Sequence, residues 1–322
     1  MLLSVRRGGT IENMNSTREA YGAALAEFGK SYDFYVLDAD LSKATQTIQF
    51  AKKFPDRFFD MGIAECNMMG YAAGMATCGA TVFVSTFAAF AAGRAYDQIR
   101  NSIAYPNLNV KIGATHGGIL IGADGGSHQC IEDIALMQAI PGMTVLCPCD
   151  TIETYACVKA AIKHNGPVYL RFGRCRTPEV YNDERTFSFK IGKGNVVKDG
   201  TDAAVIAVGD MVSQAVIASR ALAEQGINIA VLDLASIKPI DKDLIISYAK
   251  KTGFVVTIEE DHNVHGGMGS AVSEVLSVNA PTQMWMLGVQ DKFGRSGEPD
   301  ELAQMYGLTW KHIVQVIKER QS

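Results

Sequence analysis

The chain has 322 residues, of which 48% are hydrophobic and 20% charged, and its formal net charge is −4 at pH 7. This composition is typical of a globular protein of about two domains, and it lacks the basic excess that would favour nucleic acid as a partner. The seven cysteines are an odd number and lie mostly in apolar segments. They indicate reduced thiols in a cytoplasmic protein and not a disulfide framework.

Two segments raise the question of targeting or membrane insertion. Residues 1–14 hold two arginines and only a short apolar piece, so we expect a flexible leader, with Met1 or Met14 as the start, and no signal peptide. Cys66 to Gly93 has no charge and is long enough to cross a bilayer. Because this stretch is rich in small residues, it favours a helix, a buried strand and a second helix of an α/β core, and we expect no membrane span.

In chain order, a first block alternates helices with short apolar strands. Ser16 and Glu19 form a capping box that opens a helix ending near Gly29. The other elements expected are strands at 33–38, 81–85, 109–113, 143–147 and 168–172, and helices at 67–77, 88–104, 127–138 and 151–164. Such alternation predicts a parallel sheet covered on both faces.

A polar stretch near 182–193 indicates a linker, and a second alternating block follows it. Strands are expected at 203–208, 227–233 and 254–259, and helices at 211–224, 242–251 and 269–278. We therefore predict the α/β class, with two doubly wound domains of mainly parallel sheets at residues 15–185 and 190–322.

Two short motifs suggest ligand sites that their surroundings do not support. His265 to Gly269 resembles a dinucleotide fingerprint, but the third glycine position is Val272, so a tight turn is favoured. Cys147 and Cys149 have no second cysteine or histidine pair at zinc spacing, which favours buried thiols, and we expect no metal site in this chain.

Glu65 is the first candidate for chemistry. It ends the segment Asp60-Met-Gly-Ile-Ala-Glu65 and opens a long uncharged helix. A carboxylate in apolar surroundings can share a proton with a ring nitrogen of a ligand. An acid that satisfies free N–H groups at a helix N-terminus explains the same position equally well.

Two aromatic residues and two histidines follow. Phe87 and Phe90 are three residues apart at a strand-to-helix junction, so they share a face that can clamp a flat heterocycle, although such pairs are more often plain core. His116, Asp124 and His128 lie in glycine-rich loops after a strand, where parallel sheets bind ligands. This pattern suggests polar contacts to a hydroxylated or anionic substrate.

The segments GIAE, STFAAFAAGRAYDQIR, THGG, GADGGSHQ, IKPID and EEDHNVHGGMG, in this order, resemble the pyrimidine-binding and C-terminal domains of the transketolase family. The resemblance implies thiamine diphosphate as cofactor, with the electron-sink chemistry that it supplies. It gives Glu65 the hydrogen bond to N1′ of the aminopyrimidine and places Phe87 and Phe90 against that ring. It makes His116, Asp124 and His128 contacts of the sugar or its transferred fragment, and the two histidines catalytic together with Glu65.

By the same resemblance, Arg18 and Arg174 match arginines that grip the phosphate of the sugar, a role that suits a forked guanidinium. Surface salt bridges are the alternative role for these arginines. This chain differs from the family's pattern at two positions. Gly93 stands where the family often has a third aromatic residue, and Ala44, beside Thr45, stands where the family has a serine that assists the arginines. The second change allows a different anionic group on the substrate.

The chain has no Gly-Asp-Gly, the motif with which the family holds the metal of the diphosphate. Because the first helix is expected to begin at Ser16, we expect no further domain upstream of it. We therefore expect a separate N-terminal, diphosphate-binding subunit that supplies most of the Mg²⁺ site, in a heterotetramer of two plus two. The chain would be the C-terminal subunit of a split transketolase that moves a two-carbon ketol unit from a ketose to an aldose.

Three alternatives remain open. The beta subunit of a 2-oxo acid dehydrogenase has about this size, but His116 and His128 suit a polyhydroxylated sugar better. 1-Deoxyxylulose-5-phosphate synthase shares RAYDQ and GADG but normally has both halves on one chain. A non-catalytic subunit that kept the fold predicts loss of the acid and the aromatics, and all three are present.

Overall fold

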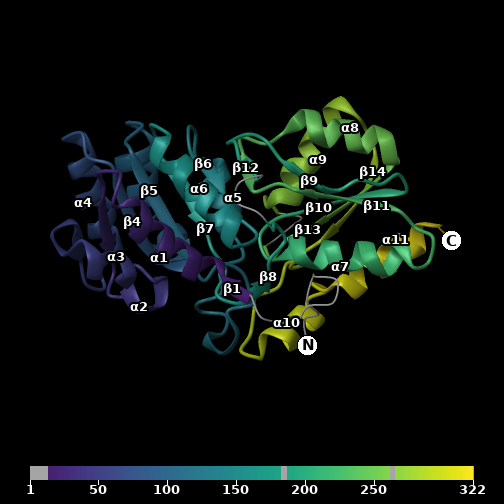
Figure 1. Cartoon of the computed structure of the whole chain (residues 1–322), viewed down its shortest axis with the longest axis horizontal. Helices are drawn as coiled ribbons and strands as arrows, with labels where there is room; N and C mark the ends of the chain where they lie inside the picture. The colour runs from purple at the N-terminus through teal and green to yellow at the C-terminus, as the bar shows by residue number, and fades with distance from the viewer. Residues whose placement is uncertain (1–13, 183–186, 262–264, 322) are drawn as a thin grey trace.

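A computed structural model describes residues 14–182, 187–261 and 265–321 (Figure 1). Residues 1–13 of the expected leader (1–14) and part of the expected linker (183–186) lie outside these residues, whereas Met14 begins the short strand β1. Two sheets with helices on both faces lie side by side along the long axis of the molecule. This confirms the predicted α/β class with doubly wound, mainly parallel sheets.

The first sheet has seven strands in the order β12-β6-β7-β5-β4-β2-β3. All its strand pairs are parallel except that between β12 and β6. In chain order, the strands are β2 (Tyr35–Asp38), β3 (Phe58–Asp60), β4 (Val82–Phe87), β5 (Val110–Thr115), β6 (Thr144–Leu146), β7 (Val168–Arg171) and β12 (Ser236–Lys238).

One face of this sheet carries α1 (Thr17–Phe28), α3 (Ile48–Lys53) and α6 (Thr151–Lys163). The other carries α4 (Glu65–Thr77), the π-helical segments η2 (Ala89–Arg94) and η3 (Gln98–Ala104), and α5 (Asp133–Ala139). Every residue of β4 and β5 is buried, as expected of parallel strands covered on both faces. Smaller elements are α2 (Ser42–Thr45), η1 (Pro55–Arg57), η4 (Gly122–Asp124) and the pair β1 (Met14–Ser16) and β8 (Arg176–Pro178).

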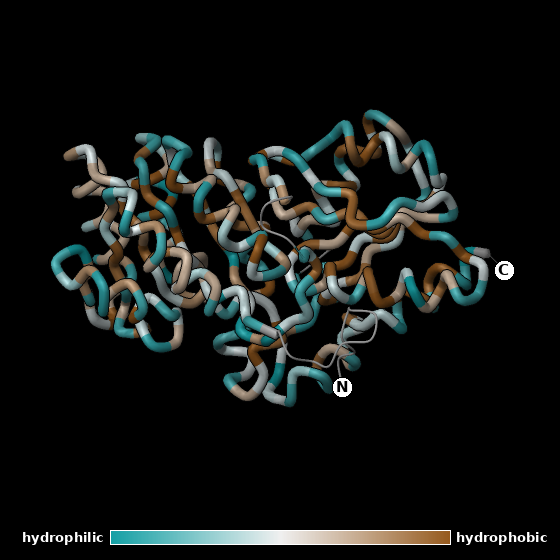
Figure 2. Tube along the Cα trace, viewed as in Figure 1, coloured by the Kyte–Doolittle hydropathy of each residue, from teal (hydrophilic) through white to brown (hydrophobic). Residues whose placement is uncertain are grey.

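The second sheet has the order β14-β13-β10-β11-β9, with only β9 antiparallel to its neighbour. Its strands are β9 (Asn195–Lys198), β10 (Ala203–Ala207), β11 (Ile229–Asp233), β13 (Phe254–Ile258) and β14 (Gln283–Leu287). Helices α8 (Lys242–Thr252) and α9 (Met268–Asn279) cover one face, and α7 (Met211–Ala223) and α11 (Trp310–Gln321) cover the other; α10 (Pro299–Met305) precedes α11. Hydrophobic residues gather along the strands of both sheets (Figure 2).

The structure corrects two of the expected helices. Residues 88–104 form two π-helical segments, with bonds such as Ala95 N–H to Phe90 O, in place of one α-helix. The helix expected from Ser127 begins only at Asp133. Residues 127–132 form a loop, in which the Gln129 side chain donates to Ile119 O and Cys130 O accepts from the Gly118 N–H.

The uncharged stretch from Cys66 to Gly93 forms most of α4, strand β4 and most of η2, as expected for a helix, a strand and a helix. Of the helices in the described part of the chain, none is long and apolar enough to cross a membrane.

Candidate functional site

The predicted site residues lie at the carboxyl ends of the parallel strands of the first sheet. Phe87 is the last residue of β4, His116 directly follows β5, and Arg174 lies three residues beyond β7. Glu65 begins α4, which follows β3. Ligands of open α/β sheets bind at this edge, so the fold brings together the residues that the sequence indicated.

Glu65 is only 2% exposed although it starts a helix. Its two carboxylate oxygens accept hydrogen bonds from one nitrogen of Arg94, Nη1, at 2.8 and 2.9 Å. The free N–H groups at the α4 N-terminus stabilise its negative charge as well. A guanidinium therefore holds this carboxylate at the N-terminus of a helix, and both expectations for Glu65 stay compatible with its position.

Phe87 and Phe90 stack with their ring centroids 5.7 Å apart and their planes at 15°. The imidazole of His116 stacks on Phe87 at 3.8 Å, and that of His128 meets Phe90 edge-on at 5.4 Å. Residues from a strand end, a helix and two loops thus form one aromatic cluster. A planar ligand placed here would contact apolar ring faces and imidazole nitrogens at the same time.

His116 is buried and has φ +60°, a left-handed conformation that is uncommon outside glycine. Its Nδ1 lies 2.8 Å from the Thr115 hydroxyl. Burial, together with the nearby Arg18, Arg174 and His128, lowers the pKa of His116 to about 3. The imidazole is therefore neutral at physiological pH and can offer or accept a hydrogen bond without carrying charge.

The loop with Asp124 and His128 packs against a loop of the second domain. The Gln129 amide nitrogen donates to Ile119 O at 2.9 Å and to Arg295 O at 3.0 Å. A Cβ at Gly126 would lie 2.7 Å from Gly294 O, so backbone packs directly on backbone there. Asp124 itself is exposed at the end of η4.

Arg18 and Arg174 line a cavity of about 370 Å³ together with Gly122, Ala123, Cys175, Glu298 and Pro299. Arg18 Nη1 donates to Ala44 O at 2.8 Å, and Arg174 Nη1 donates to Ile121 O. Burial lowers the pKa of Arg18. Two guanidinium groups at one cavity suit an anionic group of a ligand, so the structure places both arginines in one site.

The two departures from the family's pattern have structural counterparts. The hydroxyl of Thr45, beside Ala44, donates to Asp38 at 2.7 Å inside the core and does not extend the pair of arginines. At Gly93 an added Cβ would meet nothing within 4 Å. The site is therefore open on the side where a third aromatic side chain is expected.

Arg94 is the residue that sequence reasoning did not assign to the site. Its guanidinium carbon lies 4.6 Å from the centroid of the Phe90 ring while its nitrogen bonds Glu65. The spacing of four residues between Phe90 and Arg94 was a usable signal, because residues at i and i+4 of a helix share a face.

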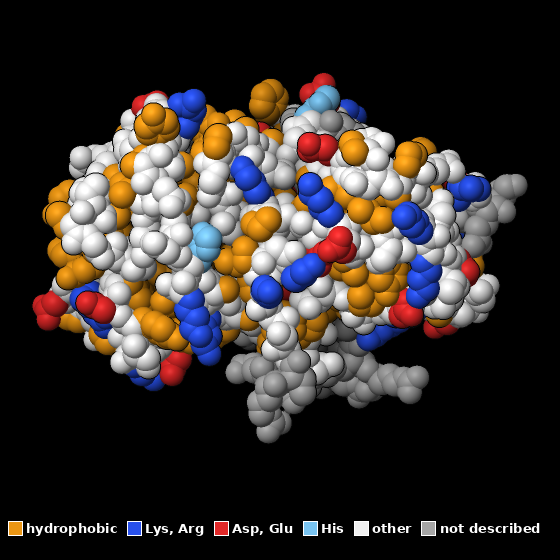
Figure 3. Space-filling model, turned by 90° about the horizontal axis from the view of Figure 1, so that it is seen from above, with side chains coloured by type: hydrophobic (Ala, Val, Ile, Leu, Met, Phe, Trp, Pro, Cys, Tyr) orange, Lys and Arg blue, Asp and Glu red, His pale blue; other side chains and the backbone are white. Residues whose placement is uncertain are grey.

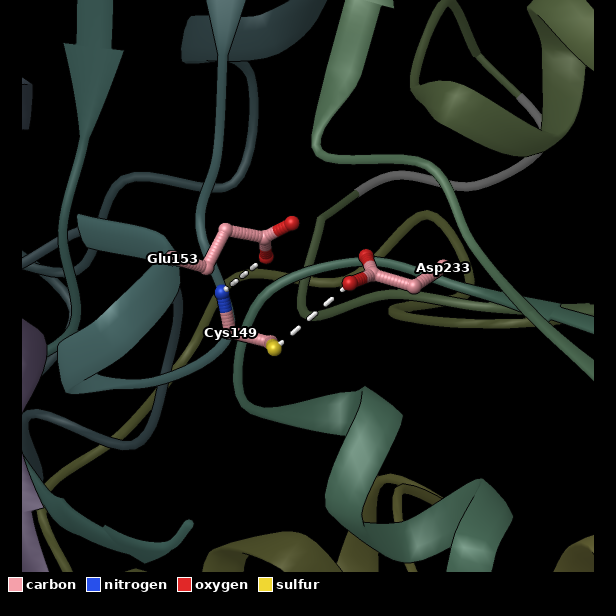
Figure 4. A group of neighbouring side chains, drawn as sticks. All are labelled: Cys149, Glu153 and Asp233. Carbon is pink, nitrogen blue, oxygen red and sulfur yellow. Dashed lines mark hydrogen bonds between the residues drawn. The ribbon is translucent and has the colours of Figure 1, made fainter. Parts of the chain in front are cut away.

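A second polar cluster lies buried at the junction of the domains (Figure 4). It consists of Cys149, Glu153 and Asp233, each of which offers one atom that could bind a metal, and these three atoms lie within 4.8 Å of one another. Glu153 accepts from the Cys149 backbone N–H at 2.9 Å, and Asp233 Oδ2 accepts from the Tyr181 hydroxyl at 2.7 Å. Within the described residues, Glu153 Oε1 and Asp233 Oδ1 have no hydrogen-bond partner.

A single proton shared by the two carboxyl groups would give both of these oxygens a partner. A cation fits this place less well, since a structural zinc site takes four ligands and the described residues offer three. Cys149, which the sequence raised as half of a metal-binding pair, therefore belongs to a carboxyl cluster.

The face of the molecule seen from above carries basic and acidic side chains interspersed among uncharged ones (Figure 3). It shows no continuous basic surface. The concentrated positive charge of the site is the pair of arginines in the cavity.

Comparison with known proteins gives two family matches. Residues 13–179 match the transketolase pyrimidine-binding domain, and residues 192–313 match the transketolase C-terminal domain. Among solved structures, a split-gene transketolase described as an inactive β4 tetramer superposes with a TM-score of 0.88 at 50% identity, covering 94% of this chain and 97% of that one.

Relatives of similar length are also named as parts of transketolases. A protein of Methanocaldococcus jannaschii, provisionally named as a transketolase C-terminal section, is 49% identical over 94% of this chain and 95% of its own length. A 6-deoxy-6-sulfo-D-fructose transketolase subunit of a Clostridium species is 41% identical over 94% and 93%. One of the subunits of an apulose-4-phosphate transketolase of Phocaeicola vulgatus is 37% identical over 95% and 98%. The chain therefore belongs to the transketolase family and corresponds to its pyrimidine-binding and C-terminal domains, as in the C-terminal part of a split transketolase.

Proposed function

We propose that this chain is the ring-activating subunit of a thiamine diphosphate-dependent transketolase, which moves a two-carbon ketol unit from a ketose to an aldose. The observation that supports this most is the buried carboxylate of Glu65 beside the stacked rings of Phe87 and Phe90. Two histidines adjoin these rings, which suits a hydroxylated substrate. A decarboxylated 2-oxo acid needs no such pair, and the relatives do not favour that alternative.

The residues present fit the aminopyrimidine of the cofactor. The guanidinium of Arg94, a planar group with N–H donors, already lies on Glu65 and over Phe90. An aminopyrimidine is likewise planar and has nitrogens that can bond a carboxylate. When bound, thiamine diphosphate supplies the electron sink for the transferred fragment.

The chain's own residues would act around that group. Glu65 would hold a proton on the ring nitrogen, and Phe87 and Phe90 would pack on the ring and exclude water. Neutral His116, with Asp124 and His128, would bind and orient the hydroxyl groups of the sugar, and the two histidines would move protons there.

Arg18 and Arg174 would hold an anionic group at the far end of the substrate. Two of the relatives are named for substrates that carry a sulfo or a phosphate group, and both groups are anions with oxygens that a guanidinium can bond. The substrate class that we propose is therefore a sugar with a terminal phosphate or sulfonate.

We further propose a partner subunit that holds the diphosphate and most of the Mg²⁺ site, in a cytoplasmic heterotetramer of two plus two. The sequence lacks Gly-Asp-Gly, and the split-gene relative is described as inactive in its β4 form. Two apolar side chains in or just before α4, the helix that Glu65 begins, are exposed: Ile63 by 77% and Tyr71 by 52%. Such exposure beside an active site fits a surface that another chain covers.

The purified chain should show no ketol transfer alone, and activity should appear when a diphosphate-binding partner is added. Glu65→Gln should leave the fold intact and reduce turnover of the complex by about 100-fold or more, because it removes the group that handles the ring proton. Ketol transfer by the chain alone, or normal turnover of the variant, would refute the proposal.

A further inference from the structure

Arg94 occupies the place that the proposed cofactor ring needs. One of its nitrogens bonds both oxygens of Glu65, and its guanidinium lies over the Phe90 ring at 4.6 Å. These are the carboxylate and one of the two aromatic faces that the proposed function assigns to the aminopyrimidine. Two planar groups cannot stack on the same ring face and bond the same carboxylate position at once.

We infer that Arg94 is a latch: it holds Glu65 in the chain without cofactor and must leave when the aminopyrimidine binds. The inference rests on the proposed function. What it adds is that the guanidinium of Arg94 and the cofactor compete for Glu65. The affinity for the cofactor therefore includes the free energy needed to break the ion pair of Arg94 with Glu65.

The surroundings of Arg94 allow this movement. Its side chain is 50% exposed, whereas the Glu65 side chain is 2% exposed. The preceding residue is Gly93, where a Cβ would meet nothing within 4 Å, so the guanidinium has open space beside it. Arg94 is also the last residue of η2, a short π-helical segment, and such segments are frequent at functional sites.

The burial of Glu65 explains why a latch is needed. A buried carboxylate without a partner is strongly destabilising, so the chain requires a donor on Glu65 before the cofactor arrives. Arg94 provides that donor, and the aminopyrimidine takes over the role when it binds. The exchange keeps Glu65 paired in both states.

The decisive test uses thiamine, which has the aminopyrimidine but no diphosphate, titrated calorimetrically into the full chain. Arg94→Met keeps the length of the side chain and removes the charge. The variant should bind thiamine at least about fivefold more tightly than the wild type, the lower end of common coupling effects. Its urea midpoint should fall, because Glu65 has lost its cation.

Arg100→Met is the matched control, since Arg100 is an exposed cation six residues further along whose Nη1 bonds Asn101. It should change neither the affinity for thiamine nor the urea midpoint. Adding Phe90→Ala to Arg94→Met should abolish the gain in affinity. These controls separate release of the latch from a general change of charge.

A purely structural role of Arg94 predicts the opposite result: unchanged, weaker or undetectable thiamine binding together with the lower midpoint. That result overturns the latch. If the complex of chain and partner still catalyses ketol transfer, the proposed function stands without it. If the complex is also inactive, the proposed function fails as well.

Discussion

At the scale of single residues, the site joins groups of opposite electrostatic character within a few ångströms. Glu65 is buried and bonded to the guanidinium of Arg94, whereas His116 is buried beside two arginines and stays neutral. The division has physical causes: burial disfavours a charged imidazole most, and the two arginines disfavour a second cation there while they favour an anion in their cavity. A neutral imidazole can then bond a sugar hydroxyl without repelling the arginines.

The lowered pKa of His116 makes the stability of the chain depend on pH. The unfolded chain takes up a proton at this residue near pH 6.5, and the folded chain does so only near pH 3. Stability is therefore lost as the pH falls below 6.5, by up to about 1.4 kcal/mol per pH unit for one proton.

His116→Asn should remove this part of the acid sensitivity, since asparagine does not titrate and tolerates a positive φ. Urea unfolding of both proteins at pH 7, 6, 5 and 4 measures the difference. Parallel curves for the two proteins would show that His116 binds its proton equally in the folded and unfolded states, which contradicts a lowered pKa. The cost of losing the ring that stacks on Phe87 shifts the whole curve and does not alter its slope.

At the scale of elements, the first sheet and its helices are held by very close approaches. Tyr21 of α1 is buried, and its hydroxyl lies 2.7 Å from that of Ser85 in β4. The same hydroxyl packs against Gly113 of β5, where a side chain would collide with it. In contrast, Gly70 and Gly74 of α4 face open space.

Alanine at these glycines should have opposite effects on stability. Gly113→Ala should cost about 2–4 kcal/mol, because it displaces the Tyr21 ring and breaks a buried hydrogen bond. Gly74→Ala should stabilise the isolated chain by about 0.5–1 kcal/mol, since it restricts the unfolded chain and meets no obstacle. Thermal and urea unfolding test both, and a destabilising Gly74→Ala would contradict open space beside Gly74.

At the scale of the whole molecule, the two domains share buried structure. Strand β12, which lies after β11 in the sequence, pairs with β6 and forms the edge of the first sheet. Arg171 of β7 bonds Asp133 in its own domain, at 3.2 Å, and Asp261 of the second domain, at 2.5 Å. The chain therefore crosses the boundary expected near residues 185–190 and still contributes a strand, β12, and an ion pair to the first sheet.

The carboxyl pair at this junction should give the chain an alkaline sensitivity. Burial raises the pKa of Asp233 to about 6 and raises that of Glu153 well above its usual range. The other titratable groups around the pair are Asp150, Cys149, Cys157 and Tyr181. Because the folded state holds a proton that the unfolded state releases, this contribution is present at low pH and is lost as the pH rises through the folded pKa values.

Glu153→Gln should make the loss of stability above pH 6 shallower, by up to about 1.4 kcal/mol per pH unit, because the amide keeps a donor on Asp233 at every pH. Glu319→Gln, on an exposed residue of α11, is the control and should leave the slope unchanged. Equal slopes for Glu153→Gln and the wild type would mean that the pair does not share a proton.

The sequence predicted the alternation of elements and most of the site because both depend on local patterns. The capping box at Ser16, the paired Phe87 and Phe90, and the glycine-rich loops are each visible within a few residues. The ion pair of Glu65 with Arg94 and the place of β12 depend on contacts between distant segments. Periodicity does not reveal such contacts, nor that the loop in place of the first half of the helix expected at 127–138 packs on a loop of the second domain.

That packing has a consequence for the synthesis of the chain. The loop that bears Asp124 and His128 rests on Gly294, which leaves the ribosome about 170 residues later. At about 5–20 residues per second, this loop waits roughly 10–30 seconds for its support. The first domain can acquire its sheet during that time, but the substrate loop is completed only after Gly294 has been made, so newly made chains pass through a period with a folded sheet and an unfinished site.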